Sequence, residues 1–124
     1  MKKILFLGLG SVLGGYARYF LSVTIDKNTG SAFPFGTLAV NAAGCFLIGC
    51  LSAIAKERFW LGDEGRLLLM TGFCGAFTTF STFMLETEQL SVSHNWMQPI
   101  GYVAISLIGG WAAFKIGLTL GQLV

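Results

Sequence analysis

The stretch of this sequence best suited to chemistry is a cluster of hydroxyl and phenylalanine residues at positions 71–83, which reads TGFCGAFTTFSTF. Phe80 and Phe83 are three positions apart, so on a helix their side chains share one face. An aromatic ring is positive around its edge, which lets the edge contact an anion, and neighbouring hydroxyls can donate to the same ion. The stretch therefore suggests an anion site without formal charge. Core or lipid packing is the alternative role of the Phe pair.

The same stretch predicts a local break in a helix. Its hydroxyl residues and glycines lower helix propensity and offer the backbone other hydrogen bonds. Carbonyls that a break exposes at membrane depth are tolerated where they are buried in protein or line a cavity, and there they can bind a cation. The alternative is an unbroken helix whose Ser and Thr side chains bond back to the preceding turn.

Isolated polar residues interrupt other apolar parts of the chain. Asn41 must find partners for its amide, either by bridging two helices or by donating to an anion. Arg18 can extend to the interface or create a positive vestibule, whereas Lys115 is near enough to the end of its stretch to reach the interface. Tyr102 and Ser106 are four positions apart and share a helical face as a row of hydroxyls.

Four apolar stretches are long enough to carry these residues across a membrane: Ile4–Ile25, Phe35–Ala55, Leu67–Leu85 and Ile100–Gly121. Of the 8 Lys and Arg and 6 Asp and Glu, only Arg18 and Lys115 fall inside them. The chain has 124 residues, of which 54% are hydrophobic and 11% charged, and this composition excludes a soluble monomer. We expect one all-α domain of four transmembrane helices over residues 1–124, with the first helix retained rather than cleaved as a signal peptide.

Small residues at every fourth position predict close helix packing. Such rows occur at 10 and 14 in the first stretch and at Gly109, Ala113, Gly117 and Gly121 in the last. The spacing does not distinguish contacts within one chain from contacts between chains. Four helices leave little room for an internal pathway, so a transport function favours an oligomer.

Several other classes of protein are disfavoured. The net charge of +2 is too small for a nucleic-acid surface. Leu13 stands where a dinucleotide-binding fingerprint starting at Gly8 needs its third glycine. The single histidine, His94, has no acid–nucleophile pair near it, and no C-x-x-C motif joins the cysteines, so neither an enzyme nor a thiolate metal site is expected.

The distribution of Lys and Arg predicts that both termini are cytoplasmic. One side of the membrane would carry five such residues and the other only Lys27. The five are Lys2, Lys3, Lys56, Arg58 and Arg66.

Three motifs closely resemble the Fluc (CrcB-type) fluoride channels of microbes: GGYARY at 14–19, FGTLAVN at 35–41 and TGFCGAFTTFSTF at 71–83. The resemblance runs over nearly the whole chain. It implies four helices with the third broken near mid-membrane, assembled as an antiparallel, dual-topology homodimer in lipid. It also implies passive export of fluoride through two pores per dimer, which protects against fluoride toxicity, and a place in the microbial inner or plasma membrane.

The resemblance also implies roles for particular residues. Phe80 and Phe83 would face the permeating fluoride, with Asn41 as an amide donor beside them. The remaining polar positions of the fluoride pathway would be Tyr102, Ser106, Thr37, Thr82 and Glu86.

A sodium ion is implied at the dimer centre, held by the backbone carbonyls of Gly75 and Thr78. Arg18 matches an arginine of the family's first helix, with a structural or vestibular role. Gly110 departs from the family's hydroxyl row, which would be shorter here. The uneven Lys and Arg count also departs from the near-equal counts that dual topology favours.

Two other functions are compatible with this chain. One is a non-conducting membrane scaffold or partner subunit, whose glycine rows serve only assembly. The other is a small four-helix drug exporter, but such carriers typically need an intramembrane acid in the first helix, which here offers only Arg18.

Overall fold

The computed structural model describes residues 1–57, 62–92 and 95–123, and within these ranges the regular structure is helical. The elements in order are α1 (Lys2–Thr29), α2 (Phe35–Glu57), α3 (Asp63–Arg66), the π-helical η1 (Leu67–Cys74), α4 (Gly75–Phe77), α5 (Ser81–Ser91) and α6 (Met97–Gln122). Arg58, counted in the predicted orientation, and His94, the single histidine, lie outside the described residues.

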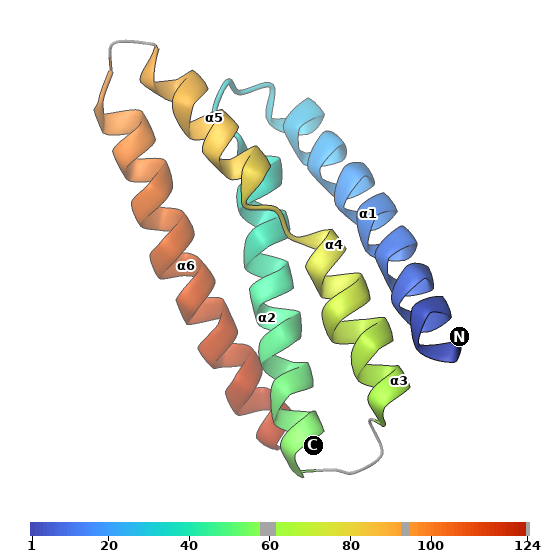
Figure 1. The fold of residues 1–124 in the computed structure, drawn as a ribbon. Helices are drawn as coiled ribbons and strands as arrows, with labels where there is room; N and C mark the ends of the chain where they lie inside the picture. The colour runs from blue at the N-terminus through green and yellow to red at the C-terminus, as the bar shows by residue number, and fades with distance from the viewer. Residues whose placement is uncertain (58–61, 93–94, 124) are drawn as a thin grey trace.

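Four helical segments are long and apolar enough to cross a membrane: Lys2–Thr29, Phe35–Lys56, Asp63–Ser91 and Met97–Gln122. The predicted number of membrane helices is therefore confirmed, although each extends beyond its apolar stretch. α1 begins and α6 ends toward the same end of the bundle (Figure 1).

Close packing of α6 on α2 depends on glycine. A Cβ at Gly117 would overlap the carbonyl oxygen of Phe46, and one at Gly121 would lie 2.6 Å from the carbonyl oxygen of Cys50. Gly109, the first member of the predicted row, has nothing within 4 Å of such a Cβ. The row is thus a packing surface within the chain only at its carboxyl end, because the two helices diverge towards the amino end of α6 (Figure 1).

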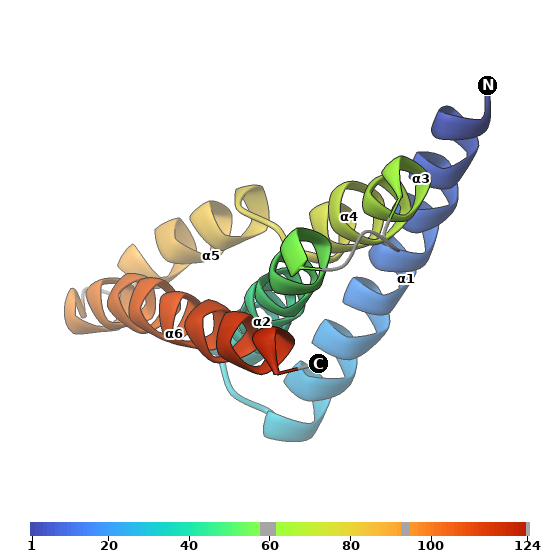
Figure 2. The same cartoon turned by 90° about the horizontal axis from the view of Figure 1, so that it is seen from below.

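A second glycine contact joins α1 to η1. A Cβ at Gly10 or Gly14 would overlap the carbonyl oxygens of Leu68 and Phe73 respectively. Seen from below, α1 lies beside the α3 to α4 segment, whereas α5 and α6 extend to the other side of α2 (Figure 2). The two contacts therefore hold two helix pairs, with α2 central to both.

The connection from α1 to α2 is fixed by one carboxylate. Gly30 ends α1 in the left-handed conformation, with φ of 56°. The Asp26 side chain then accepts a hydrogen bond from the backbone N–H of Gly36 at 2.7 Å. This bond satisfies one of the free N–H groups in the first turn of α2.

Candidate functional site

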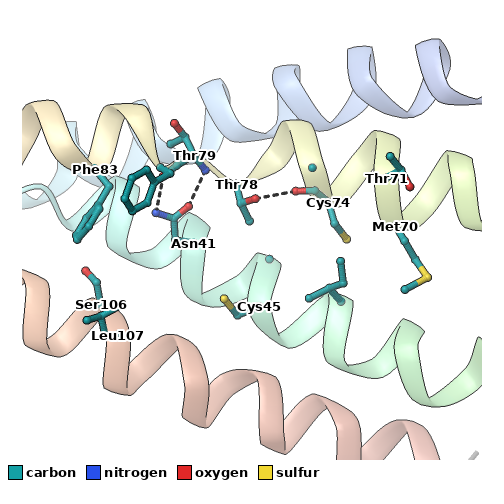
Figure 3. Close-up of a pocket in the computed structure, with 14 residues that line it drawn as sticks. Asn41, Cys45, Met70, Thr71, Cys74, Thr78, Thr79, Phe83, Ser106 and Leu107 are labelled. Atoms are coloured by element: carbon teal, nitrogen blue, oxygen red, sulfur yellow. Dashed lines mark hydrogen bonds between the residues drawn. The ribbon is translucent and has the colours of Figure 1, made fainter.

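The backbone between α4 and α5 leaves helical geometry at Thr78, where φ is −87° and ψ is 158°. The Thr78 N–H and hydroxyl both donate to the Cys74 carbonyl, at 3.1 and 2.9 Å. The chain resumes as α5 only at Ser81. A short non-helical segment, residues 78–80, with extended dihedrals at Thr78, therefore lies between two helices at the centre of the bundle (Figures 1 and 3).

Asn41 of α2 supports this segment from the side. Its Nδ2 donates to the Thr79 carbonyl at 3.0 Å, and its Oδ1 accepts from the Thr79 N–H at 2.8 Å (Figure 3). The amide therefore replaces the helical partners that Thr79 lacks. Of the two role assignments considered for Asn41, bridging is directly visible. Since Nδ2 carries two hydrogens, one remains for a second acceptor.

Thr79 caps the start of α5. Its hydroxyl oxygen accepts from the Thr82 N–H at 3.2 Å, and its O–H donates to the Thr82 hydroxyl at 3.0 Å. Threonine is a favoured helix cap because its oxygen satisfies a free N–H of the first turn. The Thr82 hydroxyl accepts in this arrangement, which leaves its own hydrogen for another acceptor.

The two phenylalanines lie together but in different surroundings. The rings of Phe80 and Phe83 are 5.9 Å apart between centroids and inclined by 46°. Phe80 is 73% exposed, whereas Phe83 is buried and packs on Tyr102 with centroids 5.0 Å apart. Phe83 thus has a fixed ring orientation, and Phe80 lies on the open side of the site.

Asn41, Phe80, Phe83 and Ser106 line one cavity of about 510 Å³. Gly75 and Thr78 also line it, and the cavity is open on one side. The Ser106 hydroxyl oxygen is buried without a hydrogen-bond partner in the described part of the chain (Figure 3). No residue lining the cavity carries a formal charge, so its polar groups are an amide, hydroxyls, thiols and backbone.

Beyond the Phe83 and Tyr102 rings, a carboxylate accepts two short hydrogen bonds. The Thr37 hydroxyl donates to Glu86 Oε1 and the Tyr102 hydroxyl to Glu86 Oε2, both at 2.7 Å. Thr37 is 4% exposed and Tyr102 is fully buried. Glu86 also lines a second, polar cavity of about 440 Å³ with Asp26, Gln89 and Gln98.

The structure therefore separates the predicted residues into two neighbouring groups. The first cavity holds Asn41, Gly75, Thr78, Phe80, Phe83 and Ser106, whereas the hydroxyl–carboxylate group holds Thr37, Glu86 and Tyr102. Thr82 contacts the break through Thr79. Arg18 lines neither cavity, and its Nε donates to the Ala76 carbonyl at 3.2 Å.

Sequence reasoning did not single out Thr79 or Asp26. Thr79 lies inside the hydroxyl-rich motif, so its position was visible, but its bonds to Asn41 depend on a residue 38 positions away. Asp26 lies in the last turn of α1, and its partner, the N–H of Gly36, is 10 residues further on, so no local signal in the sequence identified the bond. Cys45 and Cys74 also line the first cavity, and thiols in apolar stretches give no sequence signal for that position.

The chain is similar to known proteins over nearly its full length. Residues 5–118 match the family described as CrcB-like protein, Camphor Resistance (CrcB). A relative from Chlorobaculum tepidum is 46% identical over 99% of this chain and 97% of its own length. Relatives from Chloroflexus aurantiacus and Solidesulfovibrio magneticus are each 41% identical, covering 98% and 100% of this chain and 97% and 99% of their own lengths. All three are named fluoride-specific ion channel FluC.

Proposed function

Because this chain belongs to the CrcB-like family, we propose that it is a fluoride-selective channel through which fluoride leaves the cytoplasm passively, protecting the cell from fluoride toxicity. It is a multi-pass membrane protein, with four helices able to span the bilayer and ion channels among its relatives. The function is conduction and not catalysis. The observation that carries the proposal is the uncharged cavity beside the Phe pair, whose largely apolar lining includes the Asn41 amide and the Ser106 hydroxyl.

The cavity offers hydrogen-bond donors of intermediate strength. Fluoride is small and strongly hydrated, so a pore must replace its water with several donors and yet release it. The free Asn41 N–H, the unpartnered Ser106 hydroxyl and the edges of Phe80 and Phe83 meet both requirements. A fixed Arg or Lys in their place would hold the ion too strongly.

The Thr37, Glu86 and Tyr102 group would continue the pathway on the far side of Phe83. Both hydroxyls now donate to the carboxylate, at 2.7 Å each. The two hydroxyls can donate to fluoride at this point only if their hydrogens turn from Glu86 to the anion. Thr82, with a free hydroxyl hydrogen next to the break, is a further donor on this route.

A homodimer would complete the open side of the site. Phe80 is 73% exposed, and a Cβ at Gly75 would have nothing within 4 Å, so this face of the break has no cover within one chain. We assign a second, antiparallel copy to this face, which gives two pathways per dimer. The remaining exposed apolar side chains, such as Tyr16, Ile108 and Trp111, would face lipid.

The break also has features suited to the proposed sodium ion. Asn41 occupies the Thr79 N–H, which would otherwise be the helical donor to the Gly75 carbonyl. The Thr82 N–H likewise goes to the Thr79 hydroxyl and not to the Thr78 carbonyl. These two carbonyls are therefore free of helical donors, and carbonyl oxygen is a suitable sodium ligand. A bound cation there would supply positive charge and join the two copies.

Fluoride efflux from liposomes tests the proposal. Purified protein in vesicles loaded with potassium fluoride should release fluoride when valinomycin balances the charge, whereas vesicles loaded with chloride should not release chloride. Phe80→Ile and Phe83→Ile should reduce fluoride efflux because the ring edges are lost. Lys115→Met, which removes an exposed intramembrane charge outside both cavities, is the matched control.

Three outcomes would contradict the proposal. Folded protein without fluoride efflux would favour a scaffold, and equal efflux of chloride would exclude selectivity. Unchanged efflux in both Phe variants would exclude the site assignment. Mapping of both termini in cells tests the dimer separately, because a single fixed orientation would exclude antiparallel assembly.

A further inference from the structure

Arg18 contacts the end of α4, just before the interruption, from outside the proposed pathway. Its Nε donates to the Ala76 carbonyl at 3.2 Å, across 58 positions of sequence, and the side chain is only partly exposed. Ala76 is the middle residue of α4, whose last carbonyls lack helical partners because the chain becomes extended at Thr78. Arg18 therefore supplies a donor that the interrupted helix cannot.

The residues around the interruption differ in what they face: some line the uncharged cavity, and Ala76 contacts Arg18. Gly75, Thr78 and Thr79 line the uncharged cavity, whereas Ala76 does not. Successive residues of an α-helix are rotated by about 100°, so the Gly75 and Ala76 carbonyls lie on different sides of the helix. The glycine contact between Gly14 and Phe73 brings α1 close enough for Arg18 to reach the Ala76 side.

We propose that Arg18 is a positioning residue, whose hydrogen bond to the Ala76 carbonyl holds the break in the conformation that turns the Gly75 and Thr78 carbonyls towards the cavity. Asn41 fixes Thr79 from α2, and Arg18 fixes Ala76 from α1. The interruption is thus held at Thr79 by one bond donor and acceptor pair and at the end of α4 by Arg18. A charge is tolerated here because it is bonded to the backbone and lies outside the pathway.

A positioning role and a vestibular role require different properties of the Arg18 side chain. A vestibule requires the charge, so lysine should replace Arg18 and glutamine should not. A positioning bond requires an N–H donor at the position of the Arg18 Nε, which the glutamine amide nitrogen supplies and methionine does not, so glutamine should replace Arg18 better than methionine. The inference rests on the proposed channel for its activity readout only.

The first test reads the Ala76 carbonyl directly. The full chain in lipid bilayers is labelled with carbonyl-¹³C alanine and ¹⁵N phenylalanine, which selects the three Ala-Phe pairs at 32–33, 76–77 and 113–114. In Arg18→Met we expect the Ala76–Phe77 signal to shift while the other two remain. An unmoved Ala76–Phe77 signal would overturn the proposal, and this readout does not depend on fluoride conduction.

The second test compares fluoride efflux in the same variants. In Arg18→Met we expect the rate to fall about tenfold, the population change produced by loss of one charge-assisted hydrogen bond. Arg18→Gln should recover both the Ala76–Phe77 signal and most of the efflux. If Arg18→Lys restores efflux while Arg18→Gln does not, the charge is what matters and the proposal is wrong. The comparison of Gln with Lys remains decisive if the Met variant does not fold.

Discussion

The Thr37 and Tyr102 hydroxyls, which both donate to the Glu86 carboxylate, lead to a quantitative prediction. Each donates at 2.7 Å to a different oxygen of one carboxylate, and both donor residues are buried. A hydrogen bond to a charged group contributes about 1.5–3 kcal/mol to stability, against about 0.5–1.5 kcal/mol for a neutral pair. Because Glu86 also lines an open polar cavity, we expect Tyr102→Phe to lower the free energy of unfolding by about 1.5 kcal/mol, the lower end of the charged range.

The charge dependence distinguishes this bond from ring packing. In a Glu86→Gln background the acceptor is neutral and has one oxygen instead of two, so Tyr102→Phe should cost about half as much or less. Thr37→Val, which keeps the shape of the side chain, should behave in the same way. In the double variant lacking both hydroxyls, the carboxylate keeps neither donor, so the combined loss should exceed the sum of the single losses.

Reversible unfolding in mixed detergent and denaturant measures these free energies, and efflux measures the functional effect. If Tyr102→Phe costs the same with Glu86 and with Gln at that position, the hydroxyl bond is not charge-assisted and the reasoning fails. Strict additivity of Tyr102→Phe and Thr37→Val would likewise refute the view that the two hydroxyls share one acceptor.

Two further predictions concern the break and the helix packing. Asn41→Asp keeps an acceptor for the Thr79 N–H but loses the donor to the Thr79 carbonyl, so fluoride efflux should fall to background. Efflux at the wild-type rate in this variant would contradict both the bridging role and the donor role of Asn41. Gly117→Ala should destabilise the protein by about 1–3 kcal/mol through overpacking, whereas Gly109→Ala, at an open position, should be nearly neutral. If the two variants lower the thermal unfolding temperature equally, overpacking at the α2–α6 contact does not cause the destabilisation.

The helical part of the fold follows from sequence because the bilayer restricts the choices. Backbone polar groups in lipid must be satisfied internally, so long apolar stretches become helices wherever they lie. Segregation of charged residues into the connections then sets the approximate bounds. The glycine rows also indicate close packing, but they do not name the partner. Gly117 and Gly121 contact α2 in this chain, whereas a Cβ at Gly109, in the same row, would have nothing within 4 Å.

The site is only partly readable from sequence because its bonds join distant positions. The TTFSTF motif predicts hydroxyls, Phe edges and a weakened helix, all of which are local properties. The bonds between Asn41 and Thr79, and between Arg18 and Ala76, join residues far apart in the sequence, so local sequence does not predict them.

Glu86 illustrates the same division most clearly. Its sequence position near an interface is typical of a solvated helix end, since nothing nearby in the chain requires a partner. The fold brings Thr37 from α2 and Tyr102 from α6 onto its two oxygens, across 49 and 16 positions. Sequence by itself determined a membrane-spanning helical protein with an uncharged polar motif, because lipid solvation and helix propensity act on neighbouring residues. Only the tertiary structure decided which donors face which acceptors, because hydrogen bonds require atoms to meet within about 3 Å, and helix packing alone sets those distances.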